Sequence, residues 1–595
     1  MKRTKATEGK LYLPEGIIHH IMSYLNPKEE AQVAVLSKEW LSAWQLKPKL
    51  KFDDQYFEKN GHLIRYTGRI SGNCPDRREG KQKFKNYVNS TLLRYQKEHR
   101  HIIEELNIDV TFDDDQDGLA SVLDGWLEIA VEKGVKVIEL SIKSFRQRYY
   151  KVPNCILKAE SLTNLSLSKC KFQKKLKGEL MWANLLSLDL HNVRIGDKMF
   201  RAIISGCPLI NDLSISNCSG LTTIKVINLN SLREFNLYDT EGEIRALQID
   251  APSLQSMELD SFDNQSFLDE YVSHTLKDLS LTDLCISDTF FSNLINKIPH
   301  LEILEVEDCY GFERISLKNN SLKRISLNLK HTAESLEVKV ELDAPNLVKL
   351  HYGGYANLQN LSISSKPLFR DISITSPWPC IDASCFLKFN GIISNLSPHK
   401  VSLCILSRME DDINESIGYL PKFAVNAIEV RELELYVETK SSTGSRCGSD
   451  FLDNLFSSTG SRCGSDCLDN LFSHFLDGLF WACHPKTIVQ NWNPTVWLNS
   501  SDDTDFIKFL YRKLVKERRN EELHNLPFWQ HDLKKVEFEI YDKNGEKFCQ
   551  QEPLDWNNVP KASKVLFKLE WQQVNSSPRK AEESDVLNHE FSNEN

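Results

Sequence analysis

The segment Leu162-Thr-Asn-Leu-Ser-Leu167 decides the fold, because close copies of it recur at nearly regular intervals along the chain. The next two copies are Leu185-Leu-Ser-Leu-Asp-Leu190 and Ile210-Asn-Asp-Leu-Ser-Ile215. Ten such units begin with an apolar residue, at positions 137, 162, 185, 210, 232, 254, 276, 301, 322 and 347. The starts are 21 to 25 residues apart, so the sequence predicts a repeat array over residues 136–375.

A period of about 20 to 29 residues with this pattern is that of leucine-rich repeats, in which each unit is a short strand followed by a loose return. Proline stands just before the expected strand in Ala251-Pro252 and Ala344-Pro345, where its missing N–H does no harm. Stacked units build one parallel sheet along the concave face of a curved solenoid. We therefore expect an α/β fold over this part of the chain.

Strand alternation predicts that positions three, five and seven of each unit line the concave face, while the leucines lie beneath it. In the six units that start between 185 and 301, these positions carry no Lys or Arg, whereas the next two units add two cations. The charged side chains expected on this face are Asp189, Asp212, Glu234, Glu258, Asp260, Asp278, Glu305, Glu307, Arg324 and Lys349. They suggest an acidic belt with a basic patch at its far end, suited to a target protein with a basic segment. The alternative is an ordinary solvated face, because open solenoid surfaces are polar.

The cysteines point to structural thiols. The chain has 15 of them, an odd number with no CxxC pair, which argues against a disulfide framework. Cys170, Cys218 and Cys309 each lie eight residues after the start of a unit, at the N/C position of the repeat consensus. We interpret them as small buried residues at the turn that follows the strand. The closer cysteine pairs lack a second pair of ligands at zinc-finger spacing, so we expect no metal and no cofactor.

Residues 11–50 are expected to form three short helices ahead of the repeats. The first follows Leu13-Pro14, the second opens at Asn26-Pro27, and Ser37 can cap the third. About 40 residues rarely bury enough apolar area to fold well without a metal, a disulfide or a partner. Some of the apolar side chains in this head must therefore be covered, either by another protein or by the rest of this chain.

The order of residues in the head resembles the F-box, the module that binds the Skp-type adaptor of cullin–RING ubiquitin ligases. The resemblance rests on Leu13-Pro14-Glu15, on the aliphatic residues that follow at helical spacing, on Val35-Leu36-Ser37-Lys38 and on two tryptophans one turn apart. It implies that the adaptor-contacting or core residues of the module are Leu13, Pro14, Ile17, Ile18, Ile21, Leu25, Leu36, Trp40 and Trp44. Gly16 departs from the family pattern, and a glycine inside the first helix would weaken that helix by up to ~1 kcal/mol.

Residues 51–135 are expected to be a helical linker, with helices near 84–93 and 119–131. Residues 376–574 are expected to continue the repeats in degenerate form and to cap the solenoid, because an uncapped end would expose the apolar core.

A tandem duplication lies inside the capping region. Residues 442–457 and 458–473 are two copies of a 16-residue segment that differ only at Phe451 and Cys467. We expect one copy to pack and the other to loop out, because surface insertions cost little free energy. The tail, 575–595, is rich in Ser, Glu and Asn and is expected to be disordered.

Composition excludes several classes of function. The chain of 595 residues has a net charge of -10, which is the wrong sign for a protein that coats nucleic acid through its whole surface. No run approaches the ~18 apolar residues of a membrane span, and the polar start MKRTKATEGK lacks the apolar region of a secretory signal. We expect a protein of the cytoplasm, the nucleus or both, without membrane or nucleic-acid partners.

The head and the repeats together resemble the plant F-box/LRR-repeat proteins, and Leu533-Lys-Lys-Val-Glu-Phe538 downstream fits that group. The resemblance implies the substrate receptor of an SCF ubiquitin ligase, which reaches a cullin and a RING protein through the adaptor and holds an unidentified target on the solenoid. No motif of a nucleotide-binding, zinc-peptidase or serine-hydrolase site is present, so we expect no catalysis by this chain. Two alternatives stay open: a co-receptor for a hormone-like small molecule on the concave face, and a scaffold whose F-box no longer serves a ligase.

Overall fold

The computed structural model divides the chain into two compact units, Met1–Leu276 and Lys277–Asn595, and each is described by itself. The residues described are 13–25, 27–45, 47–57, 75–97, 102–112, 118–144, 148–173, 180–238, 244–261, 274–329, 338–354, 360–365, 370–377, 383–396, 398–408, 426–440, 465–491, 502–516, 528–542, 544–548, 559 and 564–572. The tail expected to be disordered, 575–595, and the first copy of the duplication, 442–457, lie outside them.

Three helices form the N-terminal head: α1 (Glu15–Met22), α2 (Pro27–Ala34) and α3 (Lys38–Gln45). Pro14 directly precedes α1 and Pro27 opens α2, positions where proline suits the first turn of a helix. The backbone N–H of Trp40 donates to Ser37 Oγ at 3.3 Å, so Ser37 caps α3. The predicted three-helix head is confirmed.

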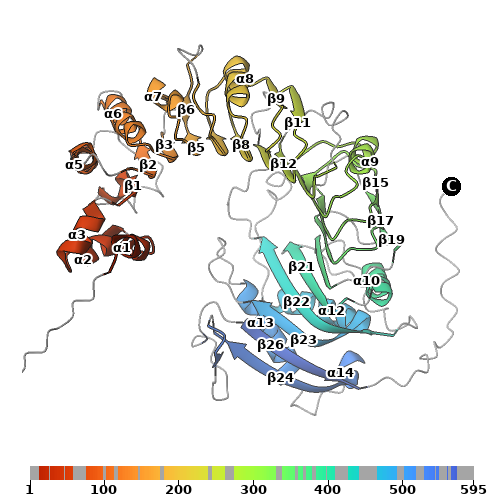
Figure 1. The fold of residues 1–595 in the computed structure, drawn as a ribbon. Coiled ribbons are helices and arrows are strands. Elements are labelled where there is room, and N and C mark those ends of the chain that lie inside the picture. Colours follow the sequence, from red (N-terminus) through yellow and green to blue (C-terminus); the bar gives the residue numbers. More distant parts are fainter. Residues whose placement is uncertain are drawn as a thin grey trace, which may run out of the picture. The chain divides into compact units, whose positions relative to one another are not determined.

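The strands of the first unit form one main ladder in which each strand pairs in parallel with the next (Figure 1). In order they are β1 (Lys49–Asp53), β2 (Glu105–Thr111), β3 (Val137–Lys143), β5 (Asn164–Ser168), β7 (Ser187–His191), β8 (Asp212–Ser216), β10 (Glu234–Tyr238) and β12 (Ser256–Asp260). Leu188 and Leu190 of β7 are buried, whereas Ser187 and Asp189, which alternate with them along the strand, are half-buried. The predicted parallel sheet and its alternation are therefore confirmed.

The ladder begins earlier than the repeat period indicated. Lys49 of β1 is in register with Glu105 of β2, and Glu105 is in register with Val137, where the first predicted unit starts. The segment expected to be a helical linker thus contributes strands as well as helices. A period search misses them because β1 and β2 are separated by the long helix α5 (Pro75–Lys97), so their spacing exceeds that of the repeats.

The return segments of the first unit carry helices and short secondary strands. Figure 1 shows α6, α7 and α8 on the same side of the main ladder. The remaining elements are η1 (Asp54–Phe57), α6 (Leu119–Glu132), β4 (Tyr150–Lys151), α7 (Asn154–Leu157), β6 (Cys170–Lys171), α8 (Asp197–Gly206), β9 (Thr223–Ile227) and β11 (Ala246–Asp250).

Several strands end in a turn that places a buried thiol under the sheet. Asn217 has a φ of 51°, a left-handed conformation that Asn tolerates better than most residues, and it directly precedes Cys218. The Cys218 Sγ donates to Leu190 O at 3.3 Å, and Cys309 Sγ makes the same bond to Leu281 O in the second unit at 3.3 Å. Two of the three consensus cysteines thus link the turn of one repeat to the strand of the preceding repeat, whereas Cys170 Sγ donates to Ser168 O of its own repeat.

The second unit continues the repeat pattern in a parallel main ladder. Its strands are β13 (Asp278–Thr282), β14 (Ile303–Cys309), β16 (Arg324–Leu329), β18 (Lys349–Gly354), β20 (Asp371–Pro377), β21 (Lys400–Arg408), β22 (Ile428–Lys440) and β23 (Cys483–Asn491). The return segments add α9 (Asp288–Asn296), β15 (Arg314–Lys318), β17 (Lys339–Asp343), β19 (Leu361–Ile363), α10 (Ala383–Leu396), α12 (Ser465–Ala482), α13 (Asp502–Tyr511), η7 (Arg512–Lys516) and α14 (Phe528–Asp532).

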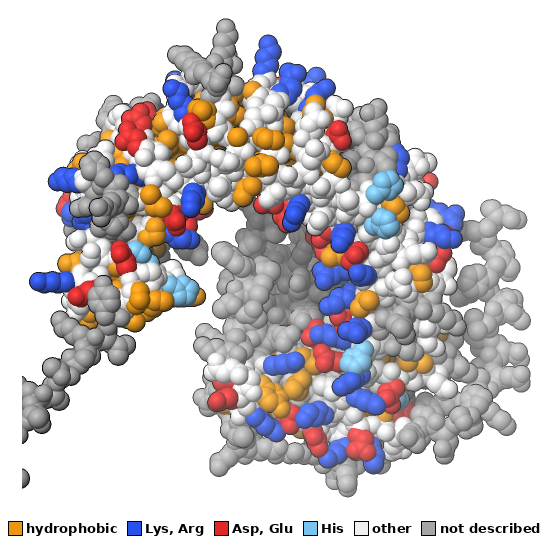
Figure 2. Space-filling model, viewed as in Figure 1, with side chains coloured by type: hydrophobic (Ala, Val, Ile, Leu, Met, Phe, Trp, Pro, Cys, Tyr) orange, Lys and Arg blue, Asp and Glu red, His pale blue; other side chains and the backbone are white. Residues whose placement is uncertain are grey.

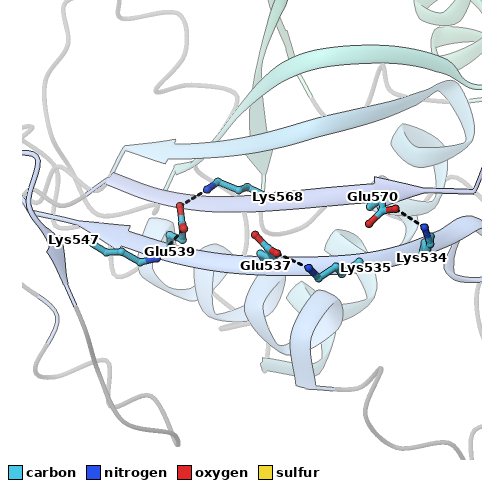
Figure 3. A network of polar contacts seen from close by, with 7 residues as sticks. All are labelled: Lys534, Lys535, Glu537, Glu539, Lys547, Lys568 and Glu570. Carbon is cyan, nitrogen blue, oxygen red and sulfur yellow. Dashed lines mark hydrogen bonds and ion pairs between the residues drawn. The ribbon is translucent and has the colours of Figure 1, made fainter.

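An antiparallel end closes the sheet of the second unit. β26 (Lys564–Trp571) pairs with β23 and with β24 (Leu533–Tyr541), and β24 pairs with β25 (Lys547–Phe548). Figure 3 shows ion pairs across these strands, in which Glu539 lies 2.8 Å from Lys547 Nζ and 2.7 Å from Lys568 Nζ. Hydrogen bonds lower the pKa of Glu539 to about 2. The largest effect comes from Lys547, followed by Lys568 and Tyr541.

The second copy of the duplication runs into α12, which begins at Ser465, and Phe472 of that copy is buried. Among the helices that the structure describes, none combines the length and the hydropathy needed to cross a membrane.

Candidate interaction surfaces

The head has a small core of its own. Ile18 and Met22 of α1 and Ala43 of α3 are buried together. Leu13, Trp40 and Trp44 are partly buried and pack against this core. The structure therefore separates the F-box residues that spacing could not: these side chains pack α1 against α3.

A second set of apolar side chains in the head is exposed. Of the residues that the F-box resemblance singled out, Ile17 is 47% exposed, Ile21 37% and Leu36 71%, and Pro14 is also exposed. Leu25 is half-buried. Figure 2 shows hydrophobic and histidine side chains together on the visible face of the head. We call Pro14, Ile17, Ile21 and Leu36 the head patch.

Three further exposed apolar residues escaped the sequence analysis as candidate contacts. Tyr24 is 77% exposed, Val35 79% and Leu41 38%. α2 ends at Ala34, so Val35 lies in the turn beside Leu36. That turn could have been predicted from Ser37, because a residue that caps the next helix requires the preceding helix to end before it.

Two residues of α1 bear on how firmly the head is built. His19 Nε2 lies 2.9 Å from Ala43 O, so this side chain joins α1 to α3. Gly16 lies inside α1, and a Cβ placed there would meet nothing within 4 Å. The glycine is therefore not required by packing.

The outward face of the first unit's ladder carries the carboxylates that the sequence predicted there. Asp189, Asp212, Glu258 and Asp260 are half-buried, and Glu234 is exposed. Ser166 Oγ donates to Asp189 Oδ2 at 2.8 Å. Their roles as target contacts stay a prediction.

Tyr238 reports the negative potential of this face. Its hydroxyl donates to Glu258 Oε2 at 2.6 Å. Burial raises the pKa of Tyr238, and the hydrogen bond to Glu258 and the charges of Glu258, Asp260 and Asp189 raise it further. Carboxylates from two strands, β7 and β12, therefore act on one point of the sheet.

The corresponding face of the second unit carries charges of both signs. Asp278 and Glu305 are half-buried and Glu307 is exposed near its start, and Arg324 is exposed further along. Figure 2 shows cationic and anionic side chains alternating over the visible face of this unit.

The second cation of the expected basic patch is in an ion pair. Lys349 Nζ lies 3.0 Å from Asp371 Oδ2 on the next strand. Lys400 Nζ in turn lies 3.3 Å from a carboxylate oxygen of Glu432 and 2.7 Å from one of Glu434. The far end of the face is thus a ladder of ion pairs rather than a purely basic surface.

Ligands suited to a metal do not converge in the described parts of the chain, where no group of three His, Cys, Asp or Glu side chains could hold an ion. Cys483 is buried, and His484 beside it stacks on Trp571 with the ring centroids 4.0 Å apart. This pair belongs to the packing of the closing strands.

Comparison with known families matches three parts of the chain. Residues 11–52 match the F-box domain. Residues 96–273 match the family described as At1g61320/AtMIF1, LRR domain, and residues 260–367 match that of FBD-associated F-box protein At5g56370, LRR repeats.

Similar proteins from Arabidopsis thaliana carry the same combination in their names. F-box/FBD/LRR-repeat protein At1g13570 is 24% identical over 346 residues, which are 57% of this chain and 74% of that protein. Putative F-box/LRR-repeat protein At4g00320 is 25% identical over 42% of this chain and 50% of its own length. F-box/LRR-repeat protein At5g02910 is 23% identical over 42% of this chain and 47% of its own length, so the chain spans about half of the last two relatives. The chain therefore combines an F-box domain with leucine-rich repeats, as the similar plant F-box/LRR-repeat proteins do by name.

Proposed function

We propose that this chain is the substrate-recognition subunit of an SCF ubiquitin ligase. The head binds a Skp-type adaptor, and through it a cullin and a RING protein, while the outward face of the repeats holds a target protein. The chain itself transforms nothing; it raises the concentration of target lysines near a separate conjugating enzyme. The proposal places its action in the cytoplasm, the nucleus or both.

The observation that carries the proposal is the exposed head patch on a matched F-box. A head of three short helices gains nothing from leaving Ile17 and Leu36 in water, since burying a side chain of this size is worth about 1.5–3 kcal/mol. Large apolar side chains left exposed on a small helical module are typical of a protein-binding site. An adaptor that covers Leu36, now 71% exposed, would gain about 1–2 kcal/mol from this side chain alone.

The test is the affinity of the full chain for a purified Skp-type adaptor, measured by isothermal titration calorimetry. Leu36→Ala should weaken binding by about 5- to 30-fold, the equivalent of 1–2 kcal/mol. Leu93→Ala is the matched control, because Leu93 is 50% exposed but lies on α5, outside the head, and should leave the affinity unchanged. Equal affinities for wild type and Leu36→Ala would contradict the proposed adaptor surface.

For the target, we propose a protein with a basic segment that binds the acidic face of the first unit. Support comes from five carboxylates on positions where no Lys or Arg occurs in the same repeats, and from the raised pKa of Tyr238 among them. An arginine-rich peptide serves as the probe. The triple charge reversal Glu234→Lys, Glu258→Lys and Asp260→Lys should abolish its capture and leave adaptor binding intact; capture that is unchanged would remove this part of the proposal.

The small-molecule alternative required cations that converge on the face of the repeats. Only Arg324 and Lys349 were candidates, and Lys349 already pairs with Asp371. No observation favours this alternative or the inactive scaffold over the ligase subunit.

A further inference from the structure

The connection between the head and the first strand is short and is held from several sides. α3 ends at Gln45 and β1 begins at Lys49, so only residues 46–48 separate the head from the sheet. A free connection of this length would still allow rotation about its backbone dihedrals. Here the described residues of the connection are tied to three different elements.

Two of the ties are made by backbone carbonyls. Tyr95, at the end of α5, is fully buried and its hydroxyl donates to Lys47 O at 2.5 Å. Pro48 O accepts the backbone N–H groups of Glu104 and Glu105 at 2.8 and 3.2 Å, where the chain enters β2. Rotation of the connection would break these bonds and leave buried groups unsatisfied.

The third tie returns to the head. Lys47 Nζ lies 2.5 Å from Glu30 Oε2 on α2, and their side chains are only 22% and 11% exposed. Burial raises the pKa of Tyr87 on α5, and the charge of Glu30 raises it further, so α5 also feels this carboxylate. The residues Glu30, Lys47 and Tyr95 therefore connect α2, the 46–48 connection and α5; we call them the junction.

We propose that the junction fixes the direction in which the head patch faces relative to the first strands of the ladder, and that Tyr95 is a positioning residue of the ligase subunit. This inference rests on the proposed function, because a fixed direction matters only if the head carries one partner and the repeats carry another. A receptor that holds its target at a set angle to the adaptor presents a limited set of target lysines to the conjugating enzyme. A freely pivoting head would spread the target over a larger volume.

The experiment measures the distance distribution between two spin labels in the full chain. The labels are attached to noncanonical amino acids that replace Lys38 in the head and Lys158 in the repeats, both of which are exposed. Tyr95→Phe removes the hydroxyl and keeps the ring. It should widen the distance distribution between the labels about twofold and speed amide hydrogen exchange at Glu104 and Glu105 about tenfold, because one tie of the connection is lost. Tyr56→Phe, at a tyrosine that is 67% exposed, is the control and should change neither quantity.

A second variant protects the test against a general loss of folding. Glu30→Gln combined with Lys47→Met removes the ion pair without leaving a buried charge, and it should widen the distribution as Tyr95→Phe does. A lower melting temperature with an unchanged width in both variants would show a merely structural role and overturn the inference. Adaptor affinity is measured alongside: if the wild type does not bind the adaptor, the proposed function fails, whereas the width alone decides whether the junction holds the head.

Discussion

Substituting two glycines in one helix pair should change stability in opposite directions. Gly478 of α12 is buried against α10, and a Cβ added there would lie 2.3 to 2.5 Å from three carbons of the Phe386 ring. The ring is itself buried and lies 6.1 Å from the ring of Phe475, so it has little room to move. Gly391, in α10, has nothing within 4 Å of the same added atom.

The magnitudes follow from the two environments. Replacing an unhindered helical Gly by Ala stabilises by about 0.5–1 kcal/mol, the value expected for Gly391→Ala. Gly478→Ala gains the same amount from the backbone but adds overpacking, which typically costs about 1–3 kcal/mol, and the short approach to Phe386 places it at the upper end. The variants should therefore differ by about 2–3 kcal/mol.

The assay is hydrogen exchange of peptides from α10 and α12 in the full chain, since a chain with two compact units need not unfold in one step. Exchange should be faster than wild type in Gly478→Ala and slower in Gly391→Ala. Adding Phe386→Leu to Gly478→Ala should recover part of the loss, because it removes the atoms that clash. If Gly478→Ala protects α12 as well as Gly391→Ala protects α10, the packing of this helix pair has been misread.

Three further outcomes test other parts of the structure. Gly16→Ala should stabilise the head by up to ~1 kcal/mol, because an added Cβ meets nothing within 4 Å. Thermal unfolding measures the stability, and calorimetry should show an unchanged adaptor affinity. A destabilised head would show that the added methyl group does clash at this position. Burial raises the pKa of Asp197, but its hydrogen bonds to Thr222 and Thr223 outweigh that effect and lower it. Asp197→Asn should therefore cost about 1 kcal/mol at pH 7, and the difference in unfolding free energy from wild type should shrink as the pH falls below the unfolded pKa of about 3.9. Glu539→Gln should lower the free energy of unfolding by up to about 1 kcal/mol at neutral pH. This difference from wild type should shrink in high salt, and also between pH 4 and 2, because the pKa of Glu539 is lowered to about 2. A difference that does not depend on salt would contradict the ion pairs.

The repeat register was predictable because every unit repeats the same apolar spacing, and a one-residue slip would turn Leu188 and Leu190 out of the core. The side chains that face away from the core followed from the same alternation. The first two strands were not found, although Leu106, Ile108 and Val110 alternate as a strand should, because they fall outside the repeat period.

The division of the head between core and surface could not be read from spacing. Ile17 and Ile18 are neighbours in a stripe that is apolar over a wide angle, so periodicity alone leaves open which of them α3 covers. The structure decides this by placing Ala43 against Ile18 and leaving Ile17 in water. Ion pairing between strands was equally hidden, since Lys349 and Asp371 are 22 residues apart and meet only through the ladder register.

That register also explains how the same repeat fold can place like charges side by side in one unit and opposite charges side by side in the other. In a parallel ladder without a register shift, equivalent positions of successive units lie side by side. A charge at one position is therefore balanced or reinforced by the residues at the same position in the units before and after it. In the second unit Arg324 and Lys349 are adjacent and have the same sign, but from Lys349 to Asp371 to Lys400 the sign alternates, so these last three charges are balanced across neighbouring strands. In the first unit Asp212 and Glu234 occupy adjacent equivalent positions with the same sign, so these two charges do not balance each other. Repulsion between these carboxylates lowers the stability of the free protein, and it decreases when the cationic side chains of a partner bind beside them. A basic partner should therefore bind at the first unit, and its affinity should fall with salt.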